Sequence, residues 1–371
     1  LEKDLPGPTG EKNIYQLKAR GLTCVISPWN FPIAIFVGQM IAALVCGNVT
    51  IVKPAEQTSN LSYIIFKLLL KAGLPKNAAA LILGKGEIIG PRIFSYNNLQ
   101  NVVFTGSLET AKIIQKQLQE RDDLINLIAE TGGLNCLIAD SSALTEHIVD
   151  DVIESAFNSA GQRCSACRIL CIEENVYEKT LFMLKGAVDT LFVSSPELIS
   201  TDVGPVIDQE AKEKIILHIN GFTKKYQSNS LNNNIGNFVN PTIIEINNIN
   251  EIKDEIFGPV LHVLSFSSKN LIELCHQINS LNYGLTLGIH SRIDKVIDTV
   301  INNTNVGNTY INRNIVGAVV GSQPFGGHHK SGTGPKAGGP EYLKKFCYEY
   351  SISNNIVAMG GNVELLSNIT D

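Results

Sequence analysis

The first 130 residues alternate between short apolar runs and stretches with helical spacing. Apolar residues recur at helical spacing from Leu61 to Leu69, after a Ser59-Asn60 cap and before Gly73, which predicts an amphipathic helix. A second helix is expected from about Leu108 to Glu120. Four apolar, β-branched runs predict buried strands: 23–27, 49–52, 79–83 and 102–104. Strands that alternate with helices indicate an α/β layer structure with a mainly parallel sheet.

A second pattern of elements follows Thr131-Gly132-Gly133. Apolar residues from Ile148 to Ala160 predict a helix that ends at Gly161, and the run 169–172 predicts a strand. Two stretches are predicted as loops, the first polar and Asn-rich and the second dense in Gly and Pro: 226–240 and 317–340.

Length and composition narrow the class of protein. A chain of 371 residues favours two domains. The net charge is −5 without a basic block, so nucleic acid is not an expected partner. No apolar run reaches the roughly 18–20 residues of a membrane helix. Eight cysteines spread along the chain do not form a disulfide framework, and we expect a reducing cytoplasm.

Cys164 is the first candidate for chemistry, and it stands between a predicted helix and a predicted strand. Catalytic thiols occur at such boundaries, beside cationic or dipolar groups that favour thiolate. The residues alone leave alternatives open: a buried structural cysteine, or a metal or redox site built on Cys164 and Cys167. Zinc would need further ligands, and no second CxxC or paired His is found. Any influence of Cys167 or Cys171 on Cys164 stays open.

Two polar side chains have the surroundings of catalytic groups. Glu130 closes an apolar run and precedes Gly132-Gly133, where backbone can approach a ligand, so it suits a general base. Asn30 lies in a turn fixed by Pro28 and Pro32, and its amide could donate to an oxyanion. The alternatives are a solvated loop glutamate and a turn asparagine that bonds its own backbone.

Glycine motifs suggest a nucleotide. Gly84-x-Gly86-x-x-x-Gly90 resembles a dinucleotide loop, but its third glycine comes one residue late. Gly106-Ser107 opens a predicted helix and could bind pyrophosphate, or simply cap that helix. We interpret His328-His329-Lys330 as surface loop, because adjacent residues on an extended chain point opposite ways.

Seven motifs occur together and in order: PWNFP, VKPAEQT, FTGS, AETGG, GQRCS, EIFGPV and QPFGG. Together they strongly resemble the aldehyde dehydrogenase superfamily over nearly the whole chain. Four further segments are similar to the pyrroline-5-carboxylate dehydrogenase group, most closely to the dehydrogenase module of the bacterial bifunctional proline-utilisation protein: LPGPTGEKN, GQRCSACR, NRNIVGAVVG and SGTGPKAGGP.

The resemblance implies a fold and a domain order. We expect an α/β protein with an aldehyde-dehydrogenase-like fold, in which a Rossmann-type NAD-binding domain precedes an α/β catalytic domain and a Gly/Pro-rich C-terminal loop segment. The expected boundaries are 1–132 for the NAD-binding domain, 133–325 for the catalytic domain, and 326–371 for a segment that returns to the NAD-binding domain and an oligomerisation region.

The resemblance also implies NAD-dependent oxidation of L-glutamate γ-semialdehyde, the open form of pyrroline-5-carboxylate, to L-glutamate in proline catabolism. Cys164 would attack the aldehyde to form a thiohemiacetal and then a thioester. Asn30 and the backbone amide of Cys164 would hold the oxyanion. Glu130 would activate the water that hydrolyses the thioester.

The same resemblance assigns binding residues. Lys53 and Glu56 would bind the adenosine ribose, and the carboxylate favours NAD over NADP because it repels a 2′-phosphate. The other implied cofactor-binding residues are Gly106, Ser107, Gly132, Glu255 and Phe257. For the substrate, Phe31 and Phe325 would flank the aliphatic chain, while Ser165, Gly317 and Ala318 would anchor the α-carboxylate. No metal ligand is expected.

One departure concerns length. Members of the superfamily carry well over a hundred residues before PWNFP, whereas 27 residues precede Pro28 here, so we expect an N-terminally incomplete cofactor domain. A complete protein is expected to form a homo-oligomer, with a proline dehydrogenase module in the parent. The alternatives are an inactive or partner-dependent remnant, an aldehyde dehydrogenase of other specificity, and a thiol–metal protein.

Overall fold

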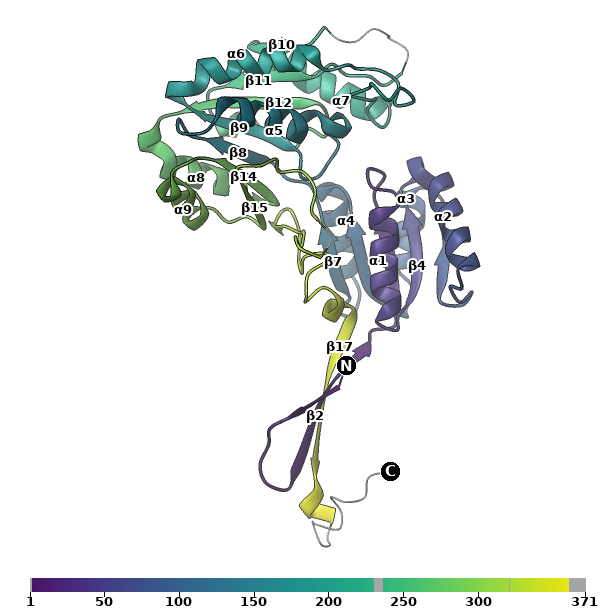
Figure 1. Cartoon of the computed structure of the whole chain (residues 1–371). Coiled ribbons are helices and arrows are strands. Elements are labelled where there is room, and N and C mark those ends of the chain that lie inside the picture. The colour runs from purple at the N-terminus through teal and green to yellow at the C-terminus, as the bar shows by residue number, and fades with distance from the viewer. Residues whose placement is uncertain (1, 230–235, 320, 360–371) are drawn as a thin grey trace. The chain divides into compact units, whose positions relative to one another are not determined.

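The computed structural model describes residues 2–229, 236–319 and 321–359 and divides into two compact units. The first unit contains the described residues of the segments 1–104, 115–128 and 340–371. The second contains those of 105–114 and 129–339. Each unit has its own central sheet (Figure 1).

The first unit has a five-stranded sheet of order β5-β4-β3-β6-β7. The pairs β3–β4, β3–β6 and β4–β5 are parallel. Its strands are β3 (Leu22–Ser27), β4 (Val49–Pro54), β5 (Ala79–Leu81), β6 (Leu99–Thr105) and β7 (Asn126–Glu130). The helices between them are α1 (Ala34–Val45), α2 (Ser59–Lys71), α3 (Gly86–Phe94) and α4 (Leu108–Gln119). This is the parallel α/β arrangement that the alternating pattern predicts.

Successive side chains of β4 point to opposite faces of this sheet, because side chains in a β-strand alternate with a period of two residues. Val52 packs with Phe36 of α1 and Phe66 of α2. Its neighbour Ile51 lines an apolar pocket of about 320 Å³ together with residues of α3, among them Ile89. Helices therefore lie on both faces, and the run at 49–52 has no polar face, although Val49 at the start of the strand is exposed.

A long antiparallel ribbon also belongs to the first unit (Figure 1). It consists of β1 (Glu2–Leu5), β2 (Glu11–Ala19) and β17 (Cys347–Asn355), and all nine residues of β17 pair with β2. Most of its side chains are exposed, including Tyr348 and Tyr350. These strands were not predicted, although Tyr348, Tyr350 and Ile352 alternate with polar residues at the strand period of two.

The second unit is built on a seven-stranded sheet of order β10-β11-β12-β9-β8-β14-β15, in which only β10 is antiparallel to its neighbour. The strands are β8 (Asn135–Ala139), β9 (Cys167–Glu173), β10 (Lys225–Gln227), β11 (Thr242–Ile246), β12 (Val260–Phe266), β14 (Thr286–His290) and β15 (Asn308–Ile311). The helices are α5 (Thr145–Phe157), α6 (Glu174–Thr190), α7 (Gln209–Asn220), α8 (Leu271–Ser280) and α9 (Asp294–Asn303).

The core of the second unit lies around β9, whose seven residues are all buried. A strand covered on both faces reads as a continuous apolar run, which is the pattern at 169–172. A two-stranded pair, β13 (Tyr283–Gly284) with β16 (His328–His329), completes the unit.

Several predicted boundaries shift. The helix predicted to reach Gly161 ends at Phe157, because Ser159 and Ala160 adopt left-handed backbone with φ of 56° and 54°. The cap predicted at Ser59-Asn60 is wrong by one position, since α2 begins at Ser59 after Thr58.

The two predicted loops also hold short strands. The stretch 226–240 begins inside β10, and its residues 230–235 lie outside the described residues. The stretch 317–340, apart from residue 320, which is not described, is irregular except for β16, so the histidines of that strand are exposed as predicted but paired with β13. The second unit extends to Gly339, whereas we expected the return to the first unit at 326. Among the described residues, no helix combines the length and apolarity needed to span a bilayer.

Candidate functional site

Cys164 lies in the loop that joins α5 to β9, at the amino end of that strand. Ser159, Ala160 and Gly161 are consecutive left-handed residues, with Gly161 at φ 65°. Left-handed backbone costs roughly 1–2 kcal/mol for a residue with a side chain. At Gly161 a Cβ would lie 2.0 Å from the carbonyl oxygen of Gly258, so only glycine fits there. The loop before the thiol is therefore held in an unfavourable shape by its surroundings.

Asn135, the first residue of β8, holds the thiol loop from the other side. Its Nδ2 donates to the carbonyl oxygens of Cys164 at 2.7 Å and Ala166 at 2.9 Å. Its Oδ1 accepts from the amide of Thr286 at 3.1 Å. Sequence reasoning missed Asn135, although a buried amide at a strand start just after the Gly132-Gly133 turn was a usable signal.

The thiol of Cys164 is partly buried, and its pKa is raised to about 12. Burial is the largest cause, followed by the carboxylates of Glu255 and Glu130; the Ser165 amide and Arg168 work in the opposite direction. The thiol is thus protonated at neutral pH, and its proton must leave when the sulfur attacks.

Glu130, the last residue of β7, is held in a cradle of glycines. Its Oε2 accepts from the amide of Gly327 at 3.1 Å, while Oε1 is buried and has no hydrogen-bond partner among the described residues. A Cβ on Gly326 would lie 2.8 Å from Oε1, and one on Gly332 would lie 2.8 Å from Oε2. Burial raises the pKa of Glu130 to about 8, against the Gly327 amide and Lys336. A carboxylate that titrates near neutral pH suits a general base.

Four of the five predicted substrate-binding residues belong to the second unit. The amide of Gly317, at φ 72°, donates to Ser165 Oγ at 3.2 Å, and its carbonyl accepts from Tyr310 at 3.1 Å. Ala318 follows directly, and Ser165 comes directly after Cys164. The structure therefore brings Ser165 and Gly317 into contact, and their role at the substrate carboxylate stays a prediction. Phe325 is partly buried and pairs through its backbone with Ala337.

Glu255 lies against the glycine turn after β7. A Cβ on Gly132 would lie 1.6 Å from Glu255 Oε2, so a side chain at position 132 would displace the Glu255 carboxylate. Burial raises the pKa of Glu255, while the ion pair with Arg168, at 3.0 Å, and the Gly133 amide lower it. Phe257 stacks under the Arg168 guanidinium at 5.1 Å.

Gly106-Ser107 forms the start of α4. Ser107 Oγ accepts from the amide of Thr110 at 3.1 Å, which is an N-cap bond. The Gly106 amide donates to the carbonyl oxygen of Glu130 at 3.1 Å. The capping alternative is thus what the structure contains, and a pyrophosphate role for these residues stays a prediction.

In the first unit, Lys53, Glu56 and Gly86 come together. Lys53 Nζ is buried and bonds Glu56 Oε2 at 3.2 Å, and Glu56 Oε1 accepts from the Gly86 amide at 3.1 Å. Burial disfavours the charged carboxylate, but the amides of Glu56 and Gly86 and the Lys53 ammonium outweigh it, and the pKa of Glu56 is lowered. Asn30 and Phe31 lie between β3 and α1 of this unit, so their roles at Cys164 stay predictions.

All eight cysteines lie in the described residues and are free thiols. Cys167 and Cys171 are fully buried in β9, and burial raises the pKa of Cys167 to about 12. Such thiols are poor nucleophiles and poor metal ligands. The described part of the chain contains no group of three or more His, Cys, Asp or Glu placed to hold a metal ion.

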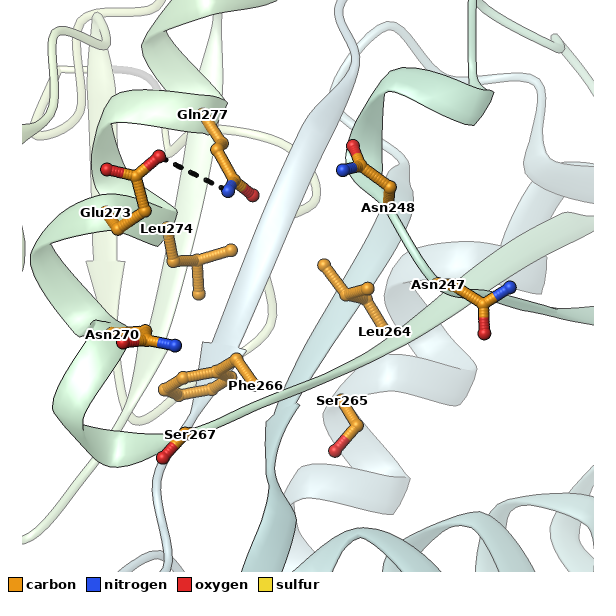
Figure 2. A pocket seen from close by; sticks show the side chains of 10 residues that line it. All are labelled: Asn247, Asn248, Leu264, Ser265, Phe266, Ser267, Asn270, Glu273, Leu274 and Gln277. Carbon is orange, nitrogen blue, oxygen red and sulfur yellow. Dashed lines mark hydrogen bonds between the residues drawn. The ribbon is translucent and has the colours of Figure 1, made fainter.

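A separate polar pocket of about 210 Å³ lies at the carboxyl ends of β11 and β12 (Figure 2). Leu264, Ser265 and Phe266 line one side, and α8 contributes Glu273 and Gln277, which bond each other at 3.4 Å. Glu255 and Gly258 precede the opposite end of β12, roughly 20 Å away at the rise of a strand. None of the predicted site residues lines this pocket.

Comparison with known proteins identifies the family of the chain. The model of the aldehyde dehydrogenase family matches residues 2–352. The bifunctional protein PutA of Salmonella typhimurium is 50% identical over 337 residues, which cover 87% of this chain and 26% of PutA. A crystal structure of a mutant proline utilization A from Bradyrhizobium japonicum has a TM-score of 0.93 at 46% identity, covering 97% of this chain and 37% of that one.

A second solved structure is shorter. It is 1-pyrroline-5-carboxylate dehydrogenase from Thermus with bound NAD, with a TM-score of 0.89 at 31% identity, and it covers 95% of this chain and 69% of that one. The chain spans about a quarter of the length of its curated PutA relative. The match over residues 2–352 shows that the chain belongs to the aldehyde dehydrogenase family.

Proposed function

We propose that this chain catalyses NAD-dependent oxidation of L-glutamate γ-semialdehyde to L-glutamate. The observation that carries the proposal is the second unit's arrangement of a positioned thiol, Cys164, with a buried carboxylate that titrates near neutral pH, Glu130. The names of the relatives, PutA and 1-pyrroline-5-carboxylate dehydrogenase, point to the substrate.

The chemistry divides between these two side chains. Cys164 Sγ adds to the aldehyde carbon as its proton leaves to solvent water, which makes a thiohemiacetal anion. The amide of Cys164 and the side chain of Asn30 hold the oxygen that becomes negative. Loss of hydride leaves a thioester. Glu130 then takes a proton from water, which adds to the thioester carbon, releases the carboxylic acid and returns the thiol.

Each unit, taken by itself, contains residues whose groups suit NAD. Lys53 and Glu56 present an ammonium and a carboxylate beside the Gly86 amide, and the low pKa of Glu56 keeps it charged against a 2′-phosphate. Ser107 at the start of α4 would face the pyrophosphate, and Glu255 against Gly132 would bond the nicotinamide ribose. When bound, the cofactor supplies the hydride acceptor.

The loop at Gly317 supports a substrate with a carboxylate. Gly317 has a positive φ and its amide donates to Ser165 Oγ, so this contact holds the loop next to Cys164, where the Ser165 hydroxyl and the Ala318 amide would bind the carboxylate. Phe325 and Phe31 would flank the aliphatic chain. A substrate that carries a carboxylate a few carbons from its aldehyde matches this arrangement.

The wider setting follows the relatives. We propose that the parent protein carries a proline-oxidising module, as the word bifunctional in the PutA name suggests, and that it works in the cytoplasm, where eight free thiols persist. Self-association through the exposed ribbon of β2 and β17 is our expectation for the complete protein.

The test measures NAD reduction by this chain with glutamate γ-semialdehyde and with propanal. We expect turnover on the first, much less on the second, and none for Cys164→Ala. Cys46→Ala is the matched control, since this partly exposed thiol belongs to the first unit. Equal turnover on both aldehydes would replace the substrate assignment, and full activity of Cys164→Ala would refute the mechanism.

A further inference from the structure

Arg168 is the largest fully buried side chain of the second unit. All of its N–H groups donate hydrogen bonds to two loops. Its Nη1 donates to the carbonyl oxygens of Gly161 at 2.7 Å and Gly258 at 3.4 Å. One Nη2 bond reaches the carbonyl oxygen of Arg163 at 3.1 Å. Nη2 and Nε both donate to Glu255 Oε1, at 3.0 and 3.3 Å. A guanidinium has five N–H groups, and these five bonds use them all.

We propose that Arg168 is a positioning residue that fixes the loop carrying Cys164 and, through the same side chain, aims the Glu255 carboxylate at the nicotinamide ribose. The inference deepens the proposed function, because it takes the role of Glu255 from there. Arg168 touches neither substrate nor reacting atoms in this assignment; it acts through its neighbours.

These bonds lie where two loops meet: the loop before β9, which carries Cys164, and the loop before β12, which carries Glu255 and Gly258. Gly161 packs so closely on the Gly258 carbonyl that no Cβ fits between them, and Arg168 bonds the carbonyl oxygens of both residues. The Gly161 carbonyl belongs to the left-handed turn, which gives it no helical partner. Without Arg168, three carbonyls and one carboxylate would lose a buried donor together.

Arg168 is itself anchored from behind by the sheet. Its carbonyl oxygen lies 3.0 Å from His262 Nδ1, and a carbonyl only accepts, so Nδ1 carries the proton. His262 Nε2 must then accept from His218 Nε2 at 2.8 Å. The ring is neutral because burial lowers the pKa of His262 to about 3. The guanidinium therefore rests on a fixed main chain.

Charge gives the inference a second line of support. The Glu255 carboxylate raises the pKa of Cys164, and Arg168 lowers it. Arg168 also lowers the pKa of Glu255, which burial raises. A buried ion pair is a weak source of stability, since apolar residues of similar volume often do as well. The arginine is better explained by its geometry, because it holds two loops together and pairs with one buried carboxylate.

The experiment compares Arg168→Met, Arg168→Lys, Glu255→Gln and the double variant Arg168→Met/Glu255→Gln. Lys185→Met is the matched control, because Lys185 also pairs with a glutamate, Glu245, at 2.9 Å but at a half-exposed site. Two readouts are independent of turnover: the Kd for NAD by calorimetry, and the rate of Cys164 alkylation by iodoacetamide between pH 7 and 10.

We expect Arg168→Met to weaken NAD binding about tenfold or more and to slow alkylation of Cys164 at every pH. Glu255→Gln should weaken NAD binding but speed alkylation. The double variant should bind NAD about as weakly as Glu255→Gln alone, since both changes break one coupling. Lysine keeps the charge but lacks the planar fork, so Arg168→Lys should show intermediate losses.

A folded Arg168→Met variant whose NAD affinity and alkylation profile stay within twofold of wild type would overturn the inference, as would additive losses in the double variant. If Arg168→Met fails to fold, Arg168→Lys decides: unchanged affinity and alkylation would overturn the inference. A wild-type chain that binds no NAD counts against the proposed function instead, and the alkylation arm still tests the loop.

Discussion

Replacing Glu130 by glutamine separates the two halves of the reaction. Glutamine has the shape of glutamate and can keep the bond from the Gly327 amide, but it cannot take a proton from water. The thiol step does not need Glu130 as a base in the proposed mechanism. Acylation of Cys164 should therefore survive, and hydrolysis of the thioester should not.

The size of the effect follows from general-base catalysis and from the pKa. Losing a positioned base costs typically 10²–10⁴-fold in rate. The pKa of Glu130 is about 8, so in wild type only about a tenth of the carboxylate is ionised at pH 7. Ionisation rises with pH, so the hydrolysis rate should increase about tenfold between pH 7 and pH 9 and then level off.

Stopped-flow absorbance of NADH measures both steps. We expect Glu130→Gln to give a burst of about one NADH per active site, followed by a steady state that is 10²–10⁴-fold slower than wild type and insensitive to pH. Glu146→Gln is the control, because Glu146 is an exposed carboxylate on α5. A steady state within threefold of wild type, or a wild-type profile that is flat from pH 6 to 9, would refute the assignment.

Three further substitutions test the surroundings. Gly332→Ala should push Glu130 out of its cradle, since the new Cβ would lie 2.8 Å from Oε2, and slow the steady state by about 10²-fold; Gly186→Ala, where nothing lies within 4 Å, should leave it unchanged, and equal rates for both would contradict the cradle. Asn135→Ala should lower the free energy of unfolding by roughly 2–4 kcal/mol in urea, because three buried backbone groups lose their partner. Glu130→Gln should also flatten the pH dependence of unfolding. The folded state keeps this proton up to about pH 8, whereas the unfolded state keeps it only up to about pH 4.5. The free energy of unfolding of the wild type should therefore decrease by about (8 − 4.5) × 1.36, or about 5 kcal/mol, as the pH rises from 4.5 to 8. Urea unfolding of the wild type without this pH dependence would show that burial does not raise the pKa of Glu130.

Local patterns predicted strands of the two central sheets, but they did not predict the ribbon of β2 and β17, whose side chains are largely exposed. The continuous run at 169–172 is a buried strand because both of its faces are covered, and the run at 49–52 is a strand that is buried from Thr50 onward except for the partly buried Ile51. The ribbon strand β17 was missed although Tyr348, Tyr350 and Ile352 alternate with polar residues; its side chains are exposed along most of its length, so no core contact accompanies that pattern. Helix α5 ended early because a tertiary contact, Gly161 on the Gly258 carbonyl, imposes left-handed backbone that local spacing does not encode.

The candidate site was likewise predicted only in part. Cys164, Glu130 and the pair Ser165 and Gly317 could be named from motifs, and the structure places all four in one unit. The groups that hold them, Asn135 and Arg168, were not named. Their importance depends on backbone carbonyls brought from distant segments, and a single sequence contains no record of which carbonyls lack partners.

The order in which the chain is made bears on how the first unit can form. Its core contains Tyr342 and Phe346 from near the end of the chain, packed with Ala43, Val103 and Ile128. Nearly all of the second unit lies between these parts in the sequence. During synthesis the second unit can fold before Tyr342 and Phe346 are available to pack on the strands of the first unit. Premature termination before Tyr342 would leave the thiol site intact in sequence yet keep the nucleotide unit from closing its core.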